Sequence, residues 1–259
     1  MIEDYRNKPA QDIHGPEEVP VTLALNEVEY ATSLVTPSDL DAWAIGFCYT
    51  EGLIDNVAQV DAIEKEPLRH GWLVRLHVDE RLADMASRQR RVGTSVSSCG
   101  RCGSASETVM MLGLKQLDPH PMITESVLQV GLKQLSDQRR SGMHVALGVY
   151  KNEHDEARTP VTGVDIGRHN ALDKLIGQVY MDNLPLPSVV IMSSRCSLEL
   201  VQKVIRANIP ALATLAVPST LAIETARLCG LQLYYCHRGE RIELLSGRTL
   251  QAFTPTVEA

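Results

Sequence analysis

Apolar and polar positions change their period along the chain, and the change separates two parts. From Val19 to Leu25 apolar residues occupy alternate positions, which predicts a half-buried strand. A turn at Asn26-Glu27 and a second strand to Val35 follow. Thr36-Pro37-Ser38-Asp39 offers hydroxyl and carboxylate caps and an early proline, so a helix is expected from there to Gly52. Another strand is expected from Trp72 to Val78.

Beyond residue 118 predicted helices alternate with short apolar strands. Helices are expected at 124–140, 168–181, 197–207 and 219–228, and strands at 144–150, 189–192, 212–216, 231–236 and 242–245. This alternation indicates a largely parallel sheet covered by helices on both faces. The sequence therefore predicts an α/β fold in two domains: a smaller N-terminal α+β part at 14–118 and an α/β core at 119–256.

The composition narrows the classes of function. The 259 residues can bury a full core, and 44% hydrophobic with 22% charged residues is ordinary for a soluble globular protein. A net charge of −7 and only 4% aromatic residues argue against a nucleic-acid binder. No apolar run approaches the ~20 residues of a membrane helix, and the N-terminus has no apolar signal core. We therefore expect a cytoplasmic protein with no membrane partner.

Two of the six cysteines form a motif. Cys99-Gly100-Arg101-Cys102-Gly103 places two thiols at CxxC spacing, which suits a disulfide, half of a metal site, or a carrier of sulfur. Its glycines, with no large apolar anchor nearby, predict a mobile loop that presents thiols to more than one partner. The other four stand singly in apolar stretches and are expected to be inert buried thiols: Cys48, Cys196, Cys229 and Cys236.

A basic cluster precedes this loop. Arg88, Arg90 and Arg91 form either a solvated charged surface or, with Arg101, a group that lowers the pKa of the thiols and attracts an anionic substrate.

The densest polar cluster runs from Asp165 to Lys174. Its helix is expected to begin at Gly167, where free backbone N–H groups suit an anion or nucleotide. Side chains three or four residues apart share a helix face, so His169 and Asp173 are expected together, opposite a buried apolar stripe. We interpret the cluster as a binding site.

The loops after the parallel strands are further candidates, because ligands of such sheets bind beyond the carboxyl ends of the strands. The rule selects Ser193-Ser194-Arg195, Pro218-Ser219-Thr220 and His237-Arg238-Gly239. The serines suit phosphate binding or helix capping, whereas Arg195 and Arg238 favour an anion. A glycine turn at 141–144 places His144 at the start of a strand.

Common catalytic motifs are absent from the sequence. It has no Walker A motif, no GxGxxG, no GxSxG and no second CxxC for a zinc ribbon. Its HDE tripeptide at 154–156 follows the CxxC, the reverse of the order in zinc deaminases.

The two main motifs together resemble the formate dehydrogenase accessory sulfurtransferases, the FdhD/NarQ family. They are CGRCG at 99–103 and DIGRHNALDKLIG at 165–177, and segments at 19–27, 36–54, 141–144 and 193–233 extend the resemblance in the expected order. The chain departs from the family pattern at Val164, Met143 and Ser194, where the family usually has glutamate, glycine and glycine.

The resemblance implies a function. The protein would take sulfur from a cysteine desulfurase, hold it as a persulfide, and deliver it to a molybdenum or tungsten bis-guanine-dinucleotide cofactor for the formate dehydrogenase catalytic subunit. It also implies a cytidine-deaminase-like three-layer core, a homodimer, binding of guanosine diphosphate groups, and no tightly bound metal of its own.

The resemblance also assigns the residues. Cys99 and Cys102 would carry sulfur. The cofactor pocket would be shaped by His144, Asp165, Arg168, His169, Asn170, Asp173, Lys174, Ser193, Arg195, Ser219 and Thr220. Two alternatives stay open: a non-catalytic chaperone for the cofactor, and a structural zinc protein in which the two cysteines pair with His144 or His169.

Overall fold

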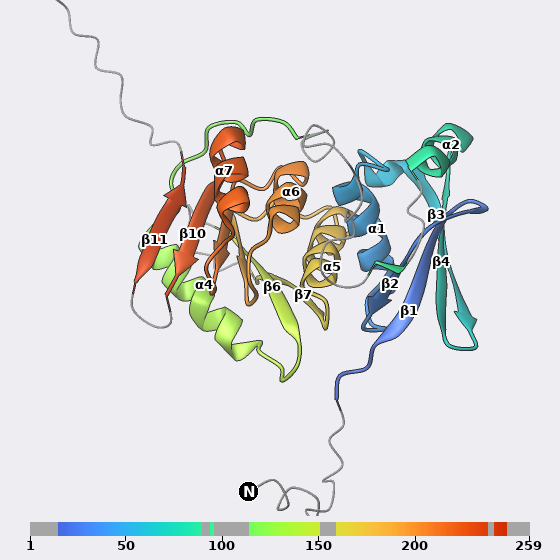
Figure 1. Ribbon diagram of the computed structural model, residues 1–259, viewed down its shortest axis with the longest axis horizontal. Helices are drawn as coiled ribbons and strands as arrows, with labels where there is room; N and C mark the ends of the chain where they lie inside the picture. Colours follow the sequence, from blue (N-terminus) through green and yellow to red (C-terminus); the bar gives the residue numbers. More distant parts are fainter. Residues whose placement is uncertain (1–14, 90–93, 96–113, 151–158, 238–240, 248–259) are drawn as a thin grey trace, which may run out of the picture.

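Two β-sheets lie side by side, and helices α1 and α5 pack between them (Figure 1). The computed structural model describes residues 15–89, 94–95, 114–150, 159–237 and 241–247. We call residues 15–95 the N-terminal lobe and residues 114–247 the C-terminal lobe. The CxxC pair lies outside the described residues, as do Arg90, Arg91, Arg101 and Arg238.

The N-terminal lobe is a five-stranded sheet in the order β3-β4-β1-β2-β5. Its strands are β1 (Val19–Leu25), β2 (Val28–Val35), β3 (Val60–Leu68), β4 (Gly71–Val78) and β5 (Thr94–Ser95), and its helices are α1 (Leu40–Glu51), the short 3-10 helix η2 (Val57–Gln59) and α2 (Glu80–Gln89). The predicted alternation in β1 is confirmed, since Val21, Leu23 and Leu25 are fully buried. Trp43 of α1 belongs to the same apolar core.

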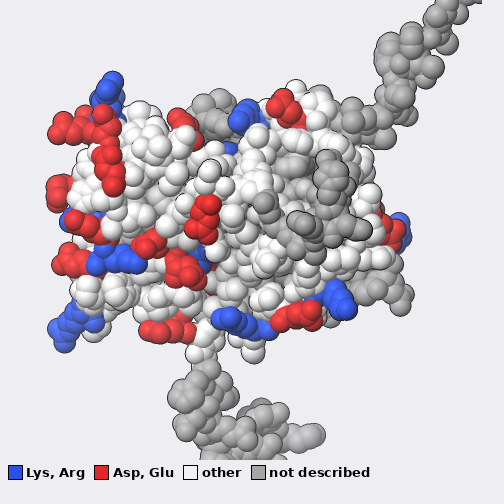
Figure 2. Space-filling model, turned by 180° about the vertical axis from the view of Figure 1, so that it is seen from behind, with Lys and Arg blue, Asp and Glu red and all other residues white. Residues whose placement is uncertain are grey.

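Four elements of this lobe were not predicted from the sequence: η2, β3, α2 and β5. In the described part of the chain, strand β3 lies at an edge of the sheet, pairs with β4 alone, and has no fully buried side chain. It exposes Asp61, Glu64 and Glu66, and Figure 2 shows acidic side chains gathered over this lobe. Charged edge strands resist pairing with other chains, which explains a polar strand without alternation. Helix α2 is amphipathic through small residues, Ala83 and Ala86.

The C-terminal lobe is a six-stranded sheet in the order β11-β10-β9-β8-β6-β7. Its strands are β6 (His144–Val149), β7 (Val161–Asp165), β8 (Val189–Met192), β9 (Ala211–Thr214), β10 (Gln232–Cys236) and β11 (Ile242–Ser246). Only β8, β9 and β10 run parallel, and β6, β7 and β11 join by antiparallel pairing. The prediction of a largely parallel sheet is therefore wrong outside its centre, because β6 and β7 form an antiparallel pair at one side.

Helices cover both faces of this sheet, so the predicted α/β class with three layers is confirmed. The helices are α4 (Glu125–Asp137), α5 (Arg168–Met181), α6 (Leu198–Arg206) and α7 (Thr220–Cys229). One face packs on α5, α6 and α7, and the other packs on α4 through Leu128 and Leu135. In the described part of the chain, no helix is long and apolar enough to cross a bilayer. The cytidine-deaminase likeness and the domain boundary stay predictions.

Helix α5 is the centre of the molecule and lacks the exposed polar face that the sequence predicted. From Asn170 to Gly177 every residue is buried. Helices α1 and α5 touch through Gly46 and Gly177: a Cβ on Gly46 would overlap the carbonyl oxygen of Asp173, and one on Gly177 that of Ala42. Glycine is required at this crossing because the two backbones are in direct contact.

Candidate functional site

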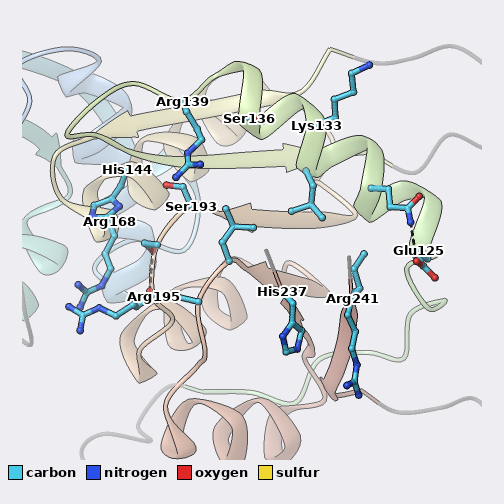
Figure 3. A pocket seen from close by; sticks show the side chains of 16 residues that line it. Glu125, Lys133, Ser136, Arg139, His144, Arg168, Ser193, Arg195, His237 and Arg241 are labelled. Atoms are coloured by element: carbon cyan, nitrogen blue, oxygen red, sulfur yellow. Dashed lines mark hydrogen bonds between the residues drawn. The ribbon is translucent and has the colours of Figure 1, made fainter. Parts of the chain in front are cut away.

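A cavity of about 1010 Å³ opens at the carboxyl ends of β8, β9 and β10, beside α4 (Figure 3). Its lining includes Ser193, Ser194 and Arg195 after β8, and His237 after β10, so two of the three loops selected by the strand-end rule meet there. Its cationic lining residues are Lys133, Arg139, Arg168, Arg195 and Arg241. Such a concentration of positive charge suits a polyanionic ligand.

Ser193 is fixed by the sheet at the floor of this cavity. Its N–H donates to the carbonyl of Val145 at 2.9 Å, and its Oγ accepts from the Val145 N–H at 2.8 Å. Because the side chain replaces a backbone acceptor, β6 and β8 stay paired to the edge of the cavity. The following loop then brings Arg195 to the opening, where its side chain is exposed.

His144 and Arg168 begin β6 and α5 and line the same wall. Burial and the guanidiniums of Arg168 and Arg195 lower the pKa of His144, so the imidazole is neutral at pH 7. Burial and Arg195 also lower the pKa of Arg168, whose buried Nε has no hydrogen-bond partner among the described residues. Two neighbouring guanidiniums, one with an unsatisfied donor, are well suited to a phosphate or pyrophosphate.

One face of α4 forms another wall, which the sequence analysis missed. Glu125, Gln129, Lys133 and Ser136 follow one another at helical spacing and line the cavity, while Leu128 and Leu135 pack on the sheet. The helical spacing of these polar residues was the signal in the sequence that could have identified this wall. Arg139 and Arg241 were missed too, since neither belongs to a motif of the sequence; Arg139 follows α4 and Arg241 precedes β11.

Asp165 and Lys174 lie away from the cavity, in an ion pair buried between the lobes. The Lys174 ammonium is 2.7 Å from Asp165 Oδ2, and both side chains are essentially inaccessible. Thr36 joins them: its N–H donates to Asp165 Oδ2 at 3.0 Å, and its carbonyl accepts from Lys174 at 2.9 Å. Thr36 therefore ties the strand-to-helix link of one lobe to the other, and the helix predicted from it begins only at Leu40.

Asn170 extends this network. Its amide donates to the carbonyl of Leu34 at 2.7 Å and to Asp165 Oδ1 at 3.0 Å, and its Oδ1 accepts from Trp43 Nε1 at 3.2 Å. All of the amide's partners are thus inside the protein.

Asp173 and Lys203 form a second buried pair. The ammonium contacts both carboxylate oxygens at 2.9 Å, and the Thr50 hydroxyl of α1 donates to Asp173 at 2.8 Å. Burial raises the pKa of Asp173 to about 6, against the opposing effects of Lys203 and Thr50. Asp165, Asn170, Asp173 and Lys174 therefore join the lobes and do not line the cavity, which corrects their predicted place in the pocket.

His169 lies between the residues that line the cavity and those that join the lobes, and it follows Arg168 in the sequence. Its Nε2 is 3.2 Å from Glu199 Oε2 and 3.4 Å from the Ser197 hydroxyl. Burial and the cations Lys203 and Arg168 lower the pKa of His169 to about 3, against the opposing effect of the Glu51 carboxylate. The ring is neutral, and we assign its Nε2–H as the donor to Glu199.

This shift predicts a pH dependence of stability. Below about pH 6.5, His169 is protonated in the unfolded chain but not in the folded chain. The free energy of unfolding therefore decreases as the pH is lowered, by up to about 1.4 kcal/mol per pH unit from this group. We expect His169→Gln to remove this slope between about pH 4 and 6. Urea titrations across that range check it. The difference between the wild-type and His169→Gln curves of unfolding free energy against pH removes the titration of Asp173, which both proteins share. Parallel curves would contradict a neutral, buried His169.

Ser219 and Thr220 do not line the cavity. Ser219 Oγ accepts from the N–H of Ala222 at 3.3 Å as the cap of α7, and both residues are exposed. The structure thus favours the capping alternative for this loop.

The described residues hold no group of three or more His, Cys, Asp or Glu side chains that could bind a metal ion. The single cysteines Cys48, Cys196, Cys229 and Cys236 are free and buried, as predicted. Burial raises the pKa of Cys196 to about 12, so its thiol is unreactive at neutral pH.

A cation-lined cavity at the strand ends of a three-layer core defines the class: an α/β protein whose strand-end cavity suits an anionic ligand. Within that class, the model of the FdhD/NarQ family matches residues 16–250, and the chain belongs to this family.

Relatives extend over most of the chain. A sulfur carrier protein FdhD from Bordetella bronchiseptica is 36% identical over 230 residues, covering 86% of this chain and 82% of that protein. A sulfur carrier protein FdhD from Chromobacterium violaceum is 32% identical over 238 residues, covering 88% of this chain and 86% of that protein. A crystal structure from Desulfotalea psychrophila is described as that of a formate dehydrogenase accessory protein. It matches 89% of this chain and 87% of its own chain with a TM-score of 0.64. At 23% identity it shows the fold alone.

Proposed function

We propose that this protein is a sulfur carrier. It accepts sulfur from a cysteine desulfurase as a persulfide on the Cys99–Cys102 pair and transfers it to a molybdenum or tungsten bis-guanine-dinucleotide cofactor destined for formate dehydrogenase. The names of its relatives and the CxxC motif support sulfur carriage. The observation that carries the rest is the cavity, whose five cationic side chains suit the phosphates of such a substrate.

The transfer needs only thiol chemistry. A thiolate of the CxxC pair attacks the outer sulfur of the donor persulfide, the donor's S–S bond breaks, and the donor leaves as a thiolate. The second thiolate then attacks the inner sulfur of the new persulfide. The outer sulfur leaves with the bonding electron pair as hydrosulfide, which the cofactor's metal takes up, and Cys99 and Cys102 are oxidised to a disulfide. A cellular dithiol restores them.

The cavity positions the substrate for this step. Arg168 and Arg195 hold phosphate oxygens, and neutral His144 beside them serves as a hydrogen-bond partner that adds no charge. His144, Arg168, Ser193 and Arg195 are thus the sequence-predicted pocket residues that keep this role. The proposal places the protein in the cytoplasm as a homodimer, with the cysteine desulfurase and the dehydrogenase catalytic subunit as its partners.

Mass spectrometry tests the sulfur chemistry. After incubation with a cysteine desulfurase and cysteine, we expect the intact protein to gain sulfur that dithiothreitol removes. The gain should disappear in a Cys99→Ala, Cys102→Ala double variant. The two single variants show which of the thiols accepts the sulfur first.

Cys229→Ala is the matched control, because it removes a buried thiol outside the motif and should load normally. Absence of loading, while a known persulfide acceptor loads under the same conditions, would overturn sulfur carriage. Retained binding of the cofactor would then indicate the non-catalytic chaperone.

A further inference from the structure

The cavity is not uniformly positive. Among the described residues that line it, Glu125 alone carries a carboxylate. Figure 3 shows Glu125 at one end and Arg168 with Arg195 at the other. At about 1.5 Å per residue, the α4 wall from Glu125 to Ser136 is about 16 Å long. A ligand that fills the cavity therefore meets opposite charges at its two ends.

Glu125 is also oriented. The amide of Gln129, one turn further along α4, donates to Glu125 Oε1 at 2.9 Å, and both side chains line the cavity. A carboxylate can accept about four hydrogen bonds, so this contact leaves capacity on both oxygens. The Glu125 carboxylate itself repels an anion, whereas a group with two adjacent N–H donors would be held by both of its oxygens.

Helix stabilisation offers a simpler account of Glu125. An acidic residue in the first turn stabilises the helix dipole, and a Gln129 pair at i,i+4 adds to it. That account needs neither a lining position in the cavity nor any ligand. It predicts an effect on stability alone, so ligand selectivity separates the two explanations.

We infer that Glu125, oriented by Gln129, is a specificity-determining residue that recognises a 2-aminopyrimidinone edge, in which a ring N–H lies beside an exocyclic amino group. Guanine and pterin both present this edge. The ligand's phosphates then lie toward Arg168 and Arg195. The inference rests on the proposed function, because the bis-guanine-dinucleotide substrate carries both ring systems together with phosphates.

Calorimetric titration with three probes tests it: GDP, IDP, which lacks only the 2-amino group, and 6-hydroxymethylpterin diphosphate. We expect the wild-type protein to bind GDP about tenfold more tightly than IDP, the size expected for a hydrogen bond to a charged group. Glu125→Gln should bring the GDP to IDP ratio close to one, since an amide offers one acceptor and places a donor against the other N–H.

The control is Glu80→Gln, which removes a first-turn carboxylate from α2 in the other lobe and should leave the ratio unchanged. If only the pterin diphosphate loses affinity in Glu125→Gln, the recognised edge belongs to the pterin, and the role of Glu125 stands. An unchanged ratio with unchanged pterin binding would overturn the inference and leave the proposed function intact. If wild-type protein bound no probe, or bound GDP equally well after Arg168→Ala, both would fail.

Discussion

Replacing Lys174 by methionine is expected to lower the free energy of unfolding by about 3–5 kcal/mol, because it leaves the Asp165 carboxylate buried without its counter-charge. Asp165 is fully buried and the two side chains pair at 2.7 Å. Thr36 would lose a partner as well, since its carbonyl accepts from Lys174. Urea denaturation followed by circular dichroism measures the change.

A surface pair provides the control. Lys65 and Asp41 lie 2.8 Å apart, but their side chains are 42% and 34% exposed, so Lys65→Met should cost about 1 kcal/mol or less. Adding Asp165→Asn to Lys174→Met should recover part of the loss, because the amide removes the unpaired charge. Equal, small losses in Lys174→Met and Lys65→Met would show that the buried pair is not strongly coupled to folding.

Gly177→Ala should be at least as damaging. The added methyl group would overlap the carbonyl oxygen of Ala42, so α1 and α5 must separate along their whole contact. We expect a loss of about 4 kcal/mol or more, at the extreme for single substitutions. Thermal unfolding measures this loss of stability. If the variant is too unstable to purify, its yield of folded protein relative to wild type reports the loss instead.

The matched substitution is Gly131→Ala, at a buried helical glycine of α4. There the new methyl group meets side-chain ends, 2.5 Å from Ile191 Cδ1 and 2.9 Å from Val149 Cγ2, which can turn aside. A loss of about 1–3 kcal/mol is expected for such overpacking. If both alanines lowered the melting temperature equally, the close backbone contact between α1 and α5 would not be limiting.

Elements with a strong period were predictable from the sequence, and elements without one were not. Strand β1 alternates cleanly and α6 is strongly amphipathic, so each was found at nearly its observed position. Strand β3 buries nothing and β7 has only five residues, one of them Gly163, which contacts the α5 backbone. Strand direction has no local signature either, and the antiparallel placement of β6 and β7 was missed for that reason.

The candidate site was half predictable for a related reason. The sequence shows which residues are polar and does not show what they contact. Arg168 and Asp173 belong to one motif, but one faces the cavity and the other pairs with Lys203 and with Thr50, 123 positions away. Their roles separate only once α5 is packed against α1. The strand-end rule found Ser193 and Arg195 because it uses topology rather than residue type.

The carboxylate of Asp165 has a practical consequence. It receives the N–H groups of both Thr36 and Gly167, so one side chain fixes the end of β2 and the start of α5. Cutting the chain between the lobes would leave Asp165 and Lys174 on one fragment without their contacts to Thr36, and it would expose the glycines at which α1 and α5 cross. Limited proteolysis, fragment complementation and domain fusion should therefore treat the two lobes as a single cooperative unit. Any hinge in the protein is better sought elsewhere than between the two lobes.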